Sequence, residues 1–191
     1  MSMLDAAIQR TEDFIADMPK SRRKKYGQFF TSKETAVFMA SWFDEPKGKK
    51  EITLLDAGAG SGILSVAAIE RAQSFACLEK ISVVCYETDE NVLPLLRENL
   101  QMTVHNSRIP VLFEIRTDNY IVSQRDEYNG TLLSADSASG YDWVIGNPPY
   151  LKIGKEAPEA LAMPDVCHGA PNLYFLFAYD SGWRKRQSLF F

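Results

Sequence analysis

The sequence predicts an α/β fold built on a doubly wound, mostly parallel β-sheet. From residue 52 onward, short apolar runs of strand length alternate with segments in a helical pattern, as strands and helices do along a parallel sheet. The first run ends in a glycine-rich loop, which is typical of the turn from a parallel strand into its helix. The chain has 191 residues, 46% of them hydrophobic. This is enough for one such domain but too little for a sizeable second one.

Residues 1–45 are expected to form a helical segment ahead of the sheet. Apolar residues spaced among charges over 3–17, with Ser2 placed to cap, predict an amphipathic helix. A second helix is expected over 33–43, capped by Thr31 or Ser32. Proline and glycine in the charged stretch 45–50 predict a turn, and residues 46–191 then form the sheet domain.

Four strands and three helices are expected after that turn. The strands are predicted at residues 52–57, 81–86, 109–115 and 141–145, and the helices at 63–72, 90–100 and 173–179. Pro94 falls near the first turn of its helix, where proline is tolerated. Residues 118–140 predict no definite element, whereas an apolar run at 189–191 begins a further strand. The carboxyl ends of the strands are the expected place for a ligand site.

Charge and cysteine content exclude several classes of protein. The formal net charge of −4 argues against a chain that mainly coats nucleic acid, although basic stretches at 20–25 and 184–186 can contact phosphates. Such stretches alone are more often solvated surface loops. Three cysteines without CxxC spacing and only two histidines predict neither a metal site nor a disulfide framework. The absence of a signal peptide and of any membrane-length apolar run predicts a cytoplasmic protein without a membrane partner.

A glycine loop and three acidic residues indicate a cofactor. The loop at 56–62 reads DAGAGSG, and its GxGxG spacing differs from the GxGxxG of dinucleotide-binding proteins. Asp56, Glu87 and Asp118 fall at the ends of three successive predicted strands. Acids at these points suit, in turn, an ammonium group, a ribose and an adenine amino group. S-adenosylmethionine carries all three, and we expect it to be the cofactor.

The tetrapeptide Asn147-Pro148-Pro149-Tyr150 follows the fourth predicted strand and predicts the catalytic site. Paired prolines alone indicate only a stiff strand exit. The Asn147 amide oxygen and the Pro148 carbonyl, however, can accept hydrogen bonds from an aromatic NH2 group and so free its lone pair to attack a sulfonium methyl. Tyr150 can stack on the ring of the base. Positioning and electrostatics then suffice for catalysis.

These motifs resemble those of the amino-methyltransferases of restriction–modification systems, within the class I S-adenosylmethionine-dependent superfamily. The resemblance covers about residues 24–180 and rests on YGQFFTS at 26–32, DAGAGSG at 56–62, YETD at 86–89, Asp118, NPPY at 147–150 and NLYFLF at 172–177. It implies an adenine-N6 DNA methyltransferase of gamma-like motif order, acting on a base flipped out of double-stranded DNA. It also implies a restriction endonuclease, fused or separately encoded.

The resemblance implies roles for individual residues as well. The segment that contains Gln28, Phe30 and Thr31 would close over the methionine end of the cofactor. The methionine moiety would lie at Asp56, Ala57, Gly58 and Gly60, the ribose at Glu87 and the cofactor adenine at Asp118. Residues 172–174 would line the target-base pocket.

The sequence departs from the family pattern in two places. Asn119 stands directly after Asp118, where the family usually has an aromatic residue, and Tyr120 follows it. A seven-stranded methyltransferase sheet needs three strands after residue 150, and the sequence provides the start of one before Phe191. We therefore expect a C-terminally truncated catalytic domain that lacks a DNA-recognition domain.

Three alternatives stay open. A protein-glutamine methyltransferase also uses NPPY, because an amide nitrogen is similarly unreactive, but the motifs at 26–32 and 172–177 argue against it. The chain can instead be a non-catalytic, cofactor-binding remnant that needs a missing C-terminal half. A nicotinamide-dependent oxidoreductase is disfavoured by the glycine spacing.

Overall fold

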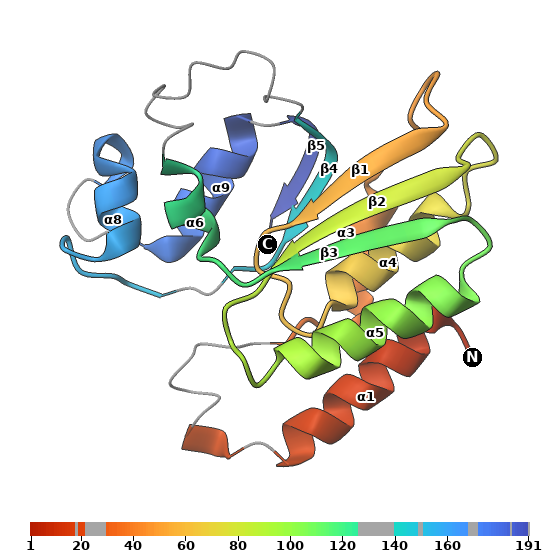
Figure 1. Ribbon diagram of the computed structural model, residues 1–191, viewed down its shortest axis with the longest axis horizontal. Helices are drawn as coiled ribbons and strands as arrows, with labels where there is room; N and C mark the ends of the chain where they lie inside the picture. Colours follow the sequence, from red (N-terminus) through yellow and green to blue (C-terminus); the bar gives the residue numbers. More distant parts are fainter. Residues whose placement is uncertain are drawn as a thin grey trace.

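The described part of the chain contains a five-stranded parallel sheet (Figure 1). The computed structural model describes residues 1–17, 19–21, 30–125, 140–148, 151–167, 172–183 and 185–190. The strands are β1 Glu51–Asp56, β2 Lys80–Tyr86, β3 Val111–Arg116, β4 Tyr141–Gly146 and β5 Lys185–Phe190. They lie in the order β3-β2-β1-β4-β5, and every neighbouring pair is parallel.

Helices cover both faces of this sheet (Figure 1). On one face lie α4 (Ile63–Ala72) and α5 (Leu93–Asn106), with α1 (Met3–Asp17) and α3 (Lys33–Ser41) packed against them. On the other face lie α6 (Tyr120–Ser123), α8 (Pro158–Ala162) and α9 (Leu173–Trp183), and a 3-10 helix, Pro164–Val166, follows α8. The predicted doubly wound α/β fold is thereby confirmed. None of the helices in the described ranges is long and apolar enough to cross a membrane.

Successive strand residues supply two separate hydrophobic cores. Leu54 packs with Val83 and Ile145 in the core beneath α4 and α5, whereas Leu55 packs with Val144 in the core beneath α6 and α9. Side chains alternate between the two faces of a strand, so a sheet covered on both faces needs apolar residues at consecutive positions. This explains the unbroken apolar runs of the sequence.

Several element boundaries differ from the prediction. The helix predicted at 90–100 begins later, at Leu93, because residues 89–92 form a turn in which the Val92 N–H donates to the Asp89 carbonyl at 2.9 Å. It also runs on to Asn106, since neither glycine nor proline interrupts 101–109. The helix predicted at 33–43 ends earlier, at Ser41, with Ser32 as its cap.

Toward the C-terminus, the helix predicted at 173–179 continues to Trp183. The strand β5 begins at Lys185, ahead of the apolar run at 189–191 from which a further strand was expected. The short helix α6 lies within residues 118–140, for which the sequence predicted no element.

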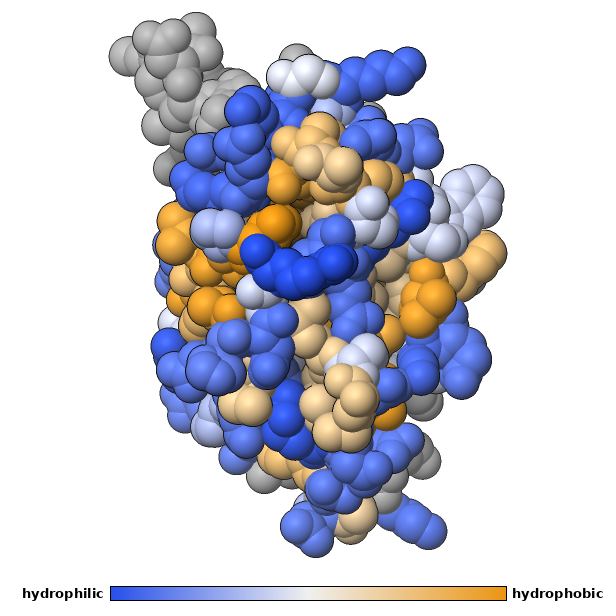
Figure 2. All heavy atoms as spheres, turned by 90° about the vertical axis from the view of Figure 1, so that its right-hand side faces the viewer, coloured by the Kyte–Doolittle hydropathy of each residue, from blue (hydrophilic) through white to orange (hydrophobic). Residues whose placement is uncertain are grey.

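The strand order creates a crevice at the carboxyl ends of β1 and β4. The chain moves outward from β1 to β3 and then returns to place β4 on the other side of β1, so the loops that leave β1 and β4 diverge. Thr53 and Asp142 hold the two strands together, with the Thr53 N–H donating to Asp142 Oδ2 at 3.0 Å. Figure 2 shows the side of the molecule where β1 to β3 begin. Hydrophilic side chains cover much of that side and separate the apolar ones into small groups.

Trp143→Ala should lower the free energy of unfolding by about 3–5 kcal/mol. Trp143 is 1% exposed, and its ring stacks on Phe43 with the ring centroids 4.4 Å apart and meets Phe75 edge-on at 6.0 Å. Urea unfolding followed by circular dichroism measures the loss. Trp42→Ala is the matched control, because Trp42 is 61% exposed and its removal should change stability by less than about 0.5 kcal/mol. Similar losses in both variants would contradict this description of the core.

Candidate cofactor and catalytic site

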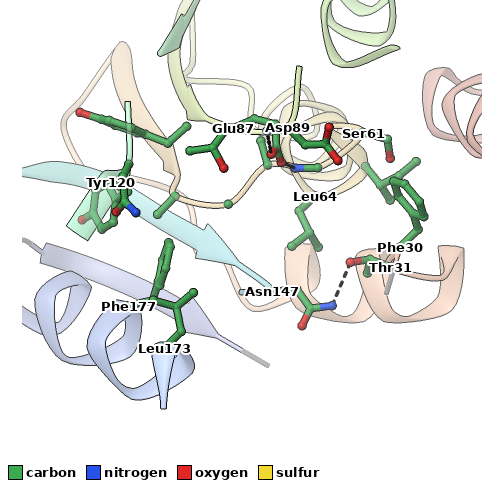
Figure 3. Close-up of a pocket in the computed structure, with 18 of the residues that line it drawn as sticks. Phe30, Thr31, Ser61, Leu64, Glu87, Asp89, Tyr120, Asn147, Leu173 and Phe177 are labelled. Carbon is green, nitrogen blue, oxygen red and sulfur yellow. Dashed lines mark hydrogen bonds between the residues drawn. The ribbon is translucent and has the colours of Figure 1, made fainter. Parts of the chain in front are cut away.

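A cavity of about 260 Å³ lies at the carboxyl ends of β1, β2 and β4 (Figure 3). Its walls come from the loop after β1, the ends of β2 and β3, the start of α4, residues 30–31, and side chains of α8 and α9. Of the predicted site residues, those that line it are Phe30, Thr31, Ala57, Gly58, Gly60, Glu87, Asp118 and Asn147. The fold thus brings together five separate segments that the sequence analysis singled out.

The loop after β1 is shaped by two glycines with positive φ. Gly60 has φ 53° and Gly62 has φ 83°, conformations that residues with a side chain avoid. Gly62 is crowded as well, since a Cβ there would lie 2.8 Å from Leu96 Cδ1. The Ala59 N–H donates to the Tyr86 carbonyl at 2.9 Å and so joins the loop to the end of β2. The glycines therefore let the backbone turn tightly beside the cavity.

Glu87, directly after β2, fixes the same loop through its carboxylate. Oε2 accepts the Gly60 N–H at 2.8 Å, and Oε1 accepts the Asp89 N–H at 2.8 Å. Burial raises the pKa of Glu87, and these backbone donors oppose the rise. Each carboxylate oxygen keeps a second lone pair. Glu87 can therefore still accept hydrogen bonds from two adjacent hydroxyl groups, as a ribose presents them.

Asp56 lies behind the loop and is not among the residues that line the cavity. Its side chain is fully buried, because strand alternation places it on the same face as Ile52 and Leu54, beneath α4. Oδ2 accepts a hydrogen bond from the Ser65 hydroxyl at 2.7 Å, and Oδ1 has no hydrogen-bond partner within the described ranges. Burial raises the pKa of Asp56 to about 7. The carboxyl group therefore supports the start of α4, and its contact with an ammonium group stays a prediction.

The segment after β3 contributes one acid to the cavity and bonds to a second acid that lies on α8. Asp118 stands exposed at the cavity edge. Asn119 caps α6, with Oδ1 accepting the Val122 N–H at 3.3 Å and Nδ2 donating to Glu159 at 2.7 Å. Glu159 of α8 also lines the cavity, and the sequence analysis missed it because a single glutamate outside any motif carries no signal. Asn119, the departure from the family pattern, thus connects α6 to α8.

Three aromatic side chains form one wall of the cavity, which we call the aromatic wall: Tyr86, Tyr120 and Phe177. The Tyr86 and Tyr120 rings meet edge-on at 5.0 Å. The Tyr120 and Phe177 rings stack at 5.5 Å (Figure 3). Leu173 lies beside Phe177, one helical turn earlier on α9. The resemblance connected residues 172–174 with a target base, whereas Leu173 and Phe177 line this cavity. The i, i+4 spacing of these two residues is the signal that could have identified Phe177.

Asn147, directly after β4, is held by the segment that precedes α3. Its Nδ2 donates to the Thr31 hydroxyl oxygen at 3.2 Å (Figure 3), which leaves the amide oxygen facing away from Thr31. Pro148 is buried, and its Cα would lie 3.9 Å from a Cβ at Gly58. The start of NPPY and the glycine loop are therefore in close contact. Three predicted site residues lie outside the described ranges: Gln28, Pro149 and Tyr150.

The charge of the cavity distinguishes between classes of ligand. Among the described residues that line it are four carboxylates and no lysine, arginine or histidine; the carboxylates belong to Glu87, Asp89, Asp118 and Glu159. Such a lining repels phosphate groups and attracts cations. The combination of acids, an aromatic wall and acceptors for paired hydroxyls fits S-adenosylmethionine, which has a sulfonium, an ammonium, a ribose and an adenine. The described ranges contain no group of His, Cys, Asp and Glu arranged to hold a metal ion.

Known proteins are similar to the chain over most of its length. The family model described as N-6 DNA Methylase matches residues 9–159. The type II methyltransferase M.PstI of Providencia stuartii is 32% identical over 84% of the chain, and M.AccI of Acinetobacter calcoaceticus is 27% identical over 94%. A tRNA1(Val) (adenine(37)-N6)-methyltransferase of Shewanella sp. (strain W3-18-1) is 30% identical over 64%. The matches cover 31%, 29% and 42% of these relatives, so the chain spans less than half of their length.

Solved structures share the fold at low sequence identity. A protein described as a class I S-adenosylmethionine-dependent methyltransferase from Listeria monocytogenes superposes with a TM-score of 0.62 at 15% identity, over 86% of this chain and 46% of its own. A type I restriction-modification methyltransferase subunit from Streptococcus thermophilus superposes with a TM-score of 0.55 at 20% identity, over 83% of this chain and 32% of its own. The fold is that of the class I methyltransferases. Since its family model matches residues 9–159, the chain belongs to the N-6 DNA Methylase family, and the predicted resemblance is confirmed.

Asp56→Asn should change how stability depends on pH. Because the folded-state pKa of Asp56 is raised to about 7, the folded chain keeps a proton that the unfolded chain releases near pH 4. This contribution to stability is fully present below about pH 4 and is lost as the pH rises to about 7. Between pH 5 and pH 8, wild type should therefore lose about 2–3 kcal/mol more unfolding free energy than Asp56→Asn in urea titrations. The exposed Asp165→Asn should follow wild type, and parallel profiles for wild type and Asp56→Asn would refute the assignment.

Proposed function

We propose that the chain forms the cofactor-binding and catalytic part of an S-adenosylmethionine-dependent DNA adenine-N6 methyltransferase of a restriction–modification system. The observation that carries this proposal is that Asn147 lines the same cavity as Glu87 and the glycine loop. An amide acceptor for an amino group therefore lies beside a site whose charge and shape suit a sulfonium nucleoside. Membership of the N-6 DNA Methylase family supports the reaction type.

In this proposal each part of the cavity holds one part of the cofactor. Glu87 accepts hydrogen bonds from the ribose hydroxyls, Asp118 accepts one from the adenine amino group, and the aromatic wall packs against the adenine ring. The methionine end lies beside Phe30, Thr31 and the glycine loop, with Gln28 as a further proposed contact. When bound, S-adenosylmethionine supplies a methyl group that its sulfonium makes electrophilic.

Asn147 then activates the target amino group. Its amide oxygen and the Pro148 carbonyl accept the two N–H bonds of the adenine NH2, which draws the nitrogen lone pair out of conjugation with the ring. The hydrogen bond from Asn147 to Thr31 fixes the amide so that its oxygen is the atom left to face the substrate. Pro149 stiffens the loop and Tyr150 stacks on the flipped base. As the bond from nitrogen to methyl forms, the bond from sulfur to methyl breaks, and the amino group then releases one proton to water. The scheme needs no strong base, because positioning and hydrogen bonding lower the barrier.

Double-stranded DNA is the proposed substrate. The type II relatives match 84% and 94% of the chain, whereas the tRNA methyltransferase matches 64%. The basic stretch at 20–25 adds charges suited to phosphates in an otherwise acidic chain. The proposal assigns closure over the cofactor to residues 1–45, and cofactor binding and catalysis to residues 46–191. It also includes a restriction endonuclease, fused or separately encoded, as a partner, and the cytoplasm as the location.

Structured RNA is a second candidate substrate, because one relative at 30% identity is a tRNA adenine-N6 methyltransferase by name. The test offers tritium-labelled S-adenosylmethionine with unmethylated double-stranded DNA, with tRNA, and with a glutamine-bearing protein. Label should appear in N6-methyladenine of the DNA. Label confined to tRNA or to protein would overturn the DNA assignment, and a wild-type chain that fails to bind the cofactor in calorimetry would overturn the whole proposal.

Asn147→Ala should lower the rate of methyl transfer at saturating cofactor by at least about 100-fold, as loss of one preorganised hydrogen-bonding group does. Cofactor affinity should stay within about twofold, because no role in cofactor binding is assigned to this side chain. Single-turnover transfer to DNA and calorimetry measure the two quantities separately. A variant that transfers at the wild-type rate would remove Asn147 from the mechanism.

Thr31→Val should lower the transfer rate about tenfold, which corresponds to the loss of one hydrogen bond of about 1.4 kcal/mol. Valine keeps the size of threonine but cannot accept the N–H from Asn147 Nδ2. Thr35→Val makes the same chemical change on the adjacent α3, where the hydroxyl bonds with Ser32, and should leave the rate unchanged. If both variants slow the reaction equally, the effect comes from the α3 segment as a whole.

A further inference from the structure

Helix α1 is connected to the cavity through two of its side chains. Phe14 meets Phe30 edge-on, with the ring centroids 6.3 Å apart. Arg10, one turn earlier on α1, donates from Nε to Oδ1 of Asn99 on α5 at 2.7 Å. The Asn99 Nδ2 in turn donates to the Ser61 carbonyl oxygen at 2.8 Å. Phe30 and Ser61 both line the cavity and lie on the same side of it in Figure 3.

Asn99 is an unusual residue for its place in the structure. It is 0% exposed and sits inside α5, where asparagine is a poorer helix former than leucine. The Ser61 carbonyl explains its presence. Gly62 is the N-cap of α4 and its own carbonyl accepts the Val66 N–H at 2.9 Å, so Ser61 stands outside the helix and its carbonyl needs another donor.

Arg10 determines which end of the Asn99 amide meets Ser61. A guanidinium only donates hydrogen bonds, so it binds the amide oxygen and leaves the NH2 group directed at the Ser61 carbonyl. Thr103 donates to the Asn99 backbone carbonyl at 2.7 Å and has no bond to the Asn99 amide. The orientation of the amide therefore depends on α1 and not on the neighbouring turn of α5.

We infer that Asn99 is a positioning residue for the cofactor loop and that Arg10 orients it, so that α1 sets the shape of the cofactor site. This inference rests on the proposed function and adds the residues through which the N-terminal helix acts on cofactor binding. The pair of hydrogen bonds from Arg10 to Asn99 and from Asn99 to Ser61 is the Arg10–Asn99 relay.

Calorimetric titration with S-adenosylmethionine tests the relay. Asn99→Leu, which keeps the size of the side chain but loses the donor to Ser61, should raise the Kd about tenfold, the equivalent of one buried hydrogen bond. Arg10→Met, at a half-buried position, should raise it about threefold by releasing the amide. Thr103→Val is the matched control in the same helix, and its Kd should equal that of wild type.

A double variant separates the relay from independent effects. In the Asn99→Leu background there is no amide to orient, so adding Arg10→Met should not weaken binding further. Hydrogen exchange without cofactor gives a second readout. The amides of Gly60 and Gly62 should exchange at least about threefold faster in Asn99→Leu and in Arg10→Met than in wild type or Thr103→Val, because loosening the loop exposes them.

The outcomes are distinct. Wild-type affinity and loop exchange in both Asn99→Leu and Arg10→Met would overturn the inference while leaving the proposed function intact. So would an equal loss of affinity in Thr103→Val, since the effect would then be general weakening of α5. If wild type itself does not bind S-adenosylmethionine, the proposed function fails, and the loop exchange rates still decide whether the relay positions the loop.

Discussion

The two hydrogen bonds of the Glu87 carboxylate are the constraint on which the site depends. Parallel pairing sets Asp56 of β1 level with Cys85 of β2, so the segments that leave these strands start side by side. Glu87 then bonds to the Gly60 N–H in one segment and to the Asp89 N–H in the other. A longer or differently shaped loop would break one of these bonds and leave one oxygen of a half-buried carboxylate without its donor, which is costly. The same carboxylate therefore fixes the loop and presents the acceptors that a ribose requires.

The sequence predicted the parts of the fold that follow from local patterns. The helix at 63–72 has the predicted bounds, because it starts directly after the glycine loop and its residues follow a helical pattern. Helix α1 also has its predicted bounds, because its apolar residues are spaced as in an amphipathic helix. The short helices α6 and α8 carry no such pattern. Their placement depends on tertiary contacts, such as the Asn119–Glu159 hydrogen bond across 40 positions, which a single sequence does not display.

The residues of the candidate site show the same difference between local patterns and tertiary contacts. Glu87, Asp118 and Asn147 were identified because each lies within two residues after a strand, and residues there gather at one edge of a parallel sheet. Asp56 was chosen by the same rule, but it is the last residue of its strand and not the first residue after it. Strand alternation therefore directs its side chain into the core. Glu159 and Asn99 escaped notice because their roles arise from contacts between distant segments. The Arg10–Asn99 bond, for example, spans 89 positions.

The central place of β1 has a consequence for how the chain reaches its native state. Its partner β2 lies 29 positions away, from Glu51 to Lys80, whereas the bond between Thr53 and Asp142 of β4 spans 89. Joining distant segments costs more chain entropy and is slower, so we expect β1, β2 and β3 to assemble before β4 arrives with Asn147. During that interval the backbone of β1 is an open edge that a strand from a neighbouring unfinished chain can occupy. Aggregation during synthesis therefore competes with the docking of the strand that completes the site.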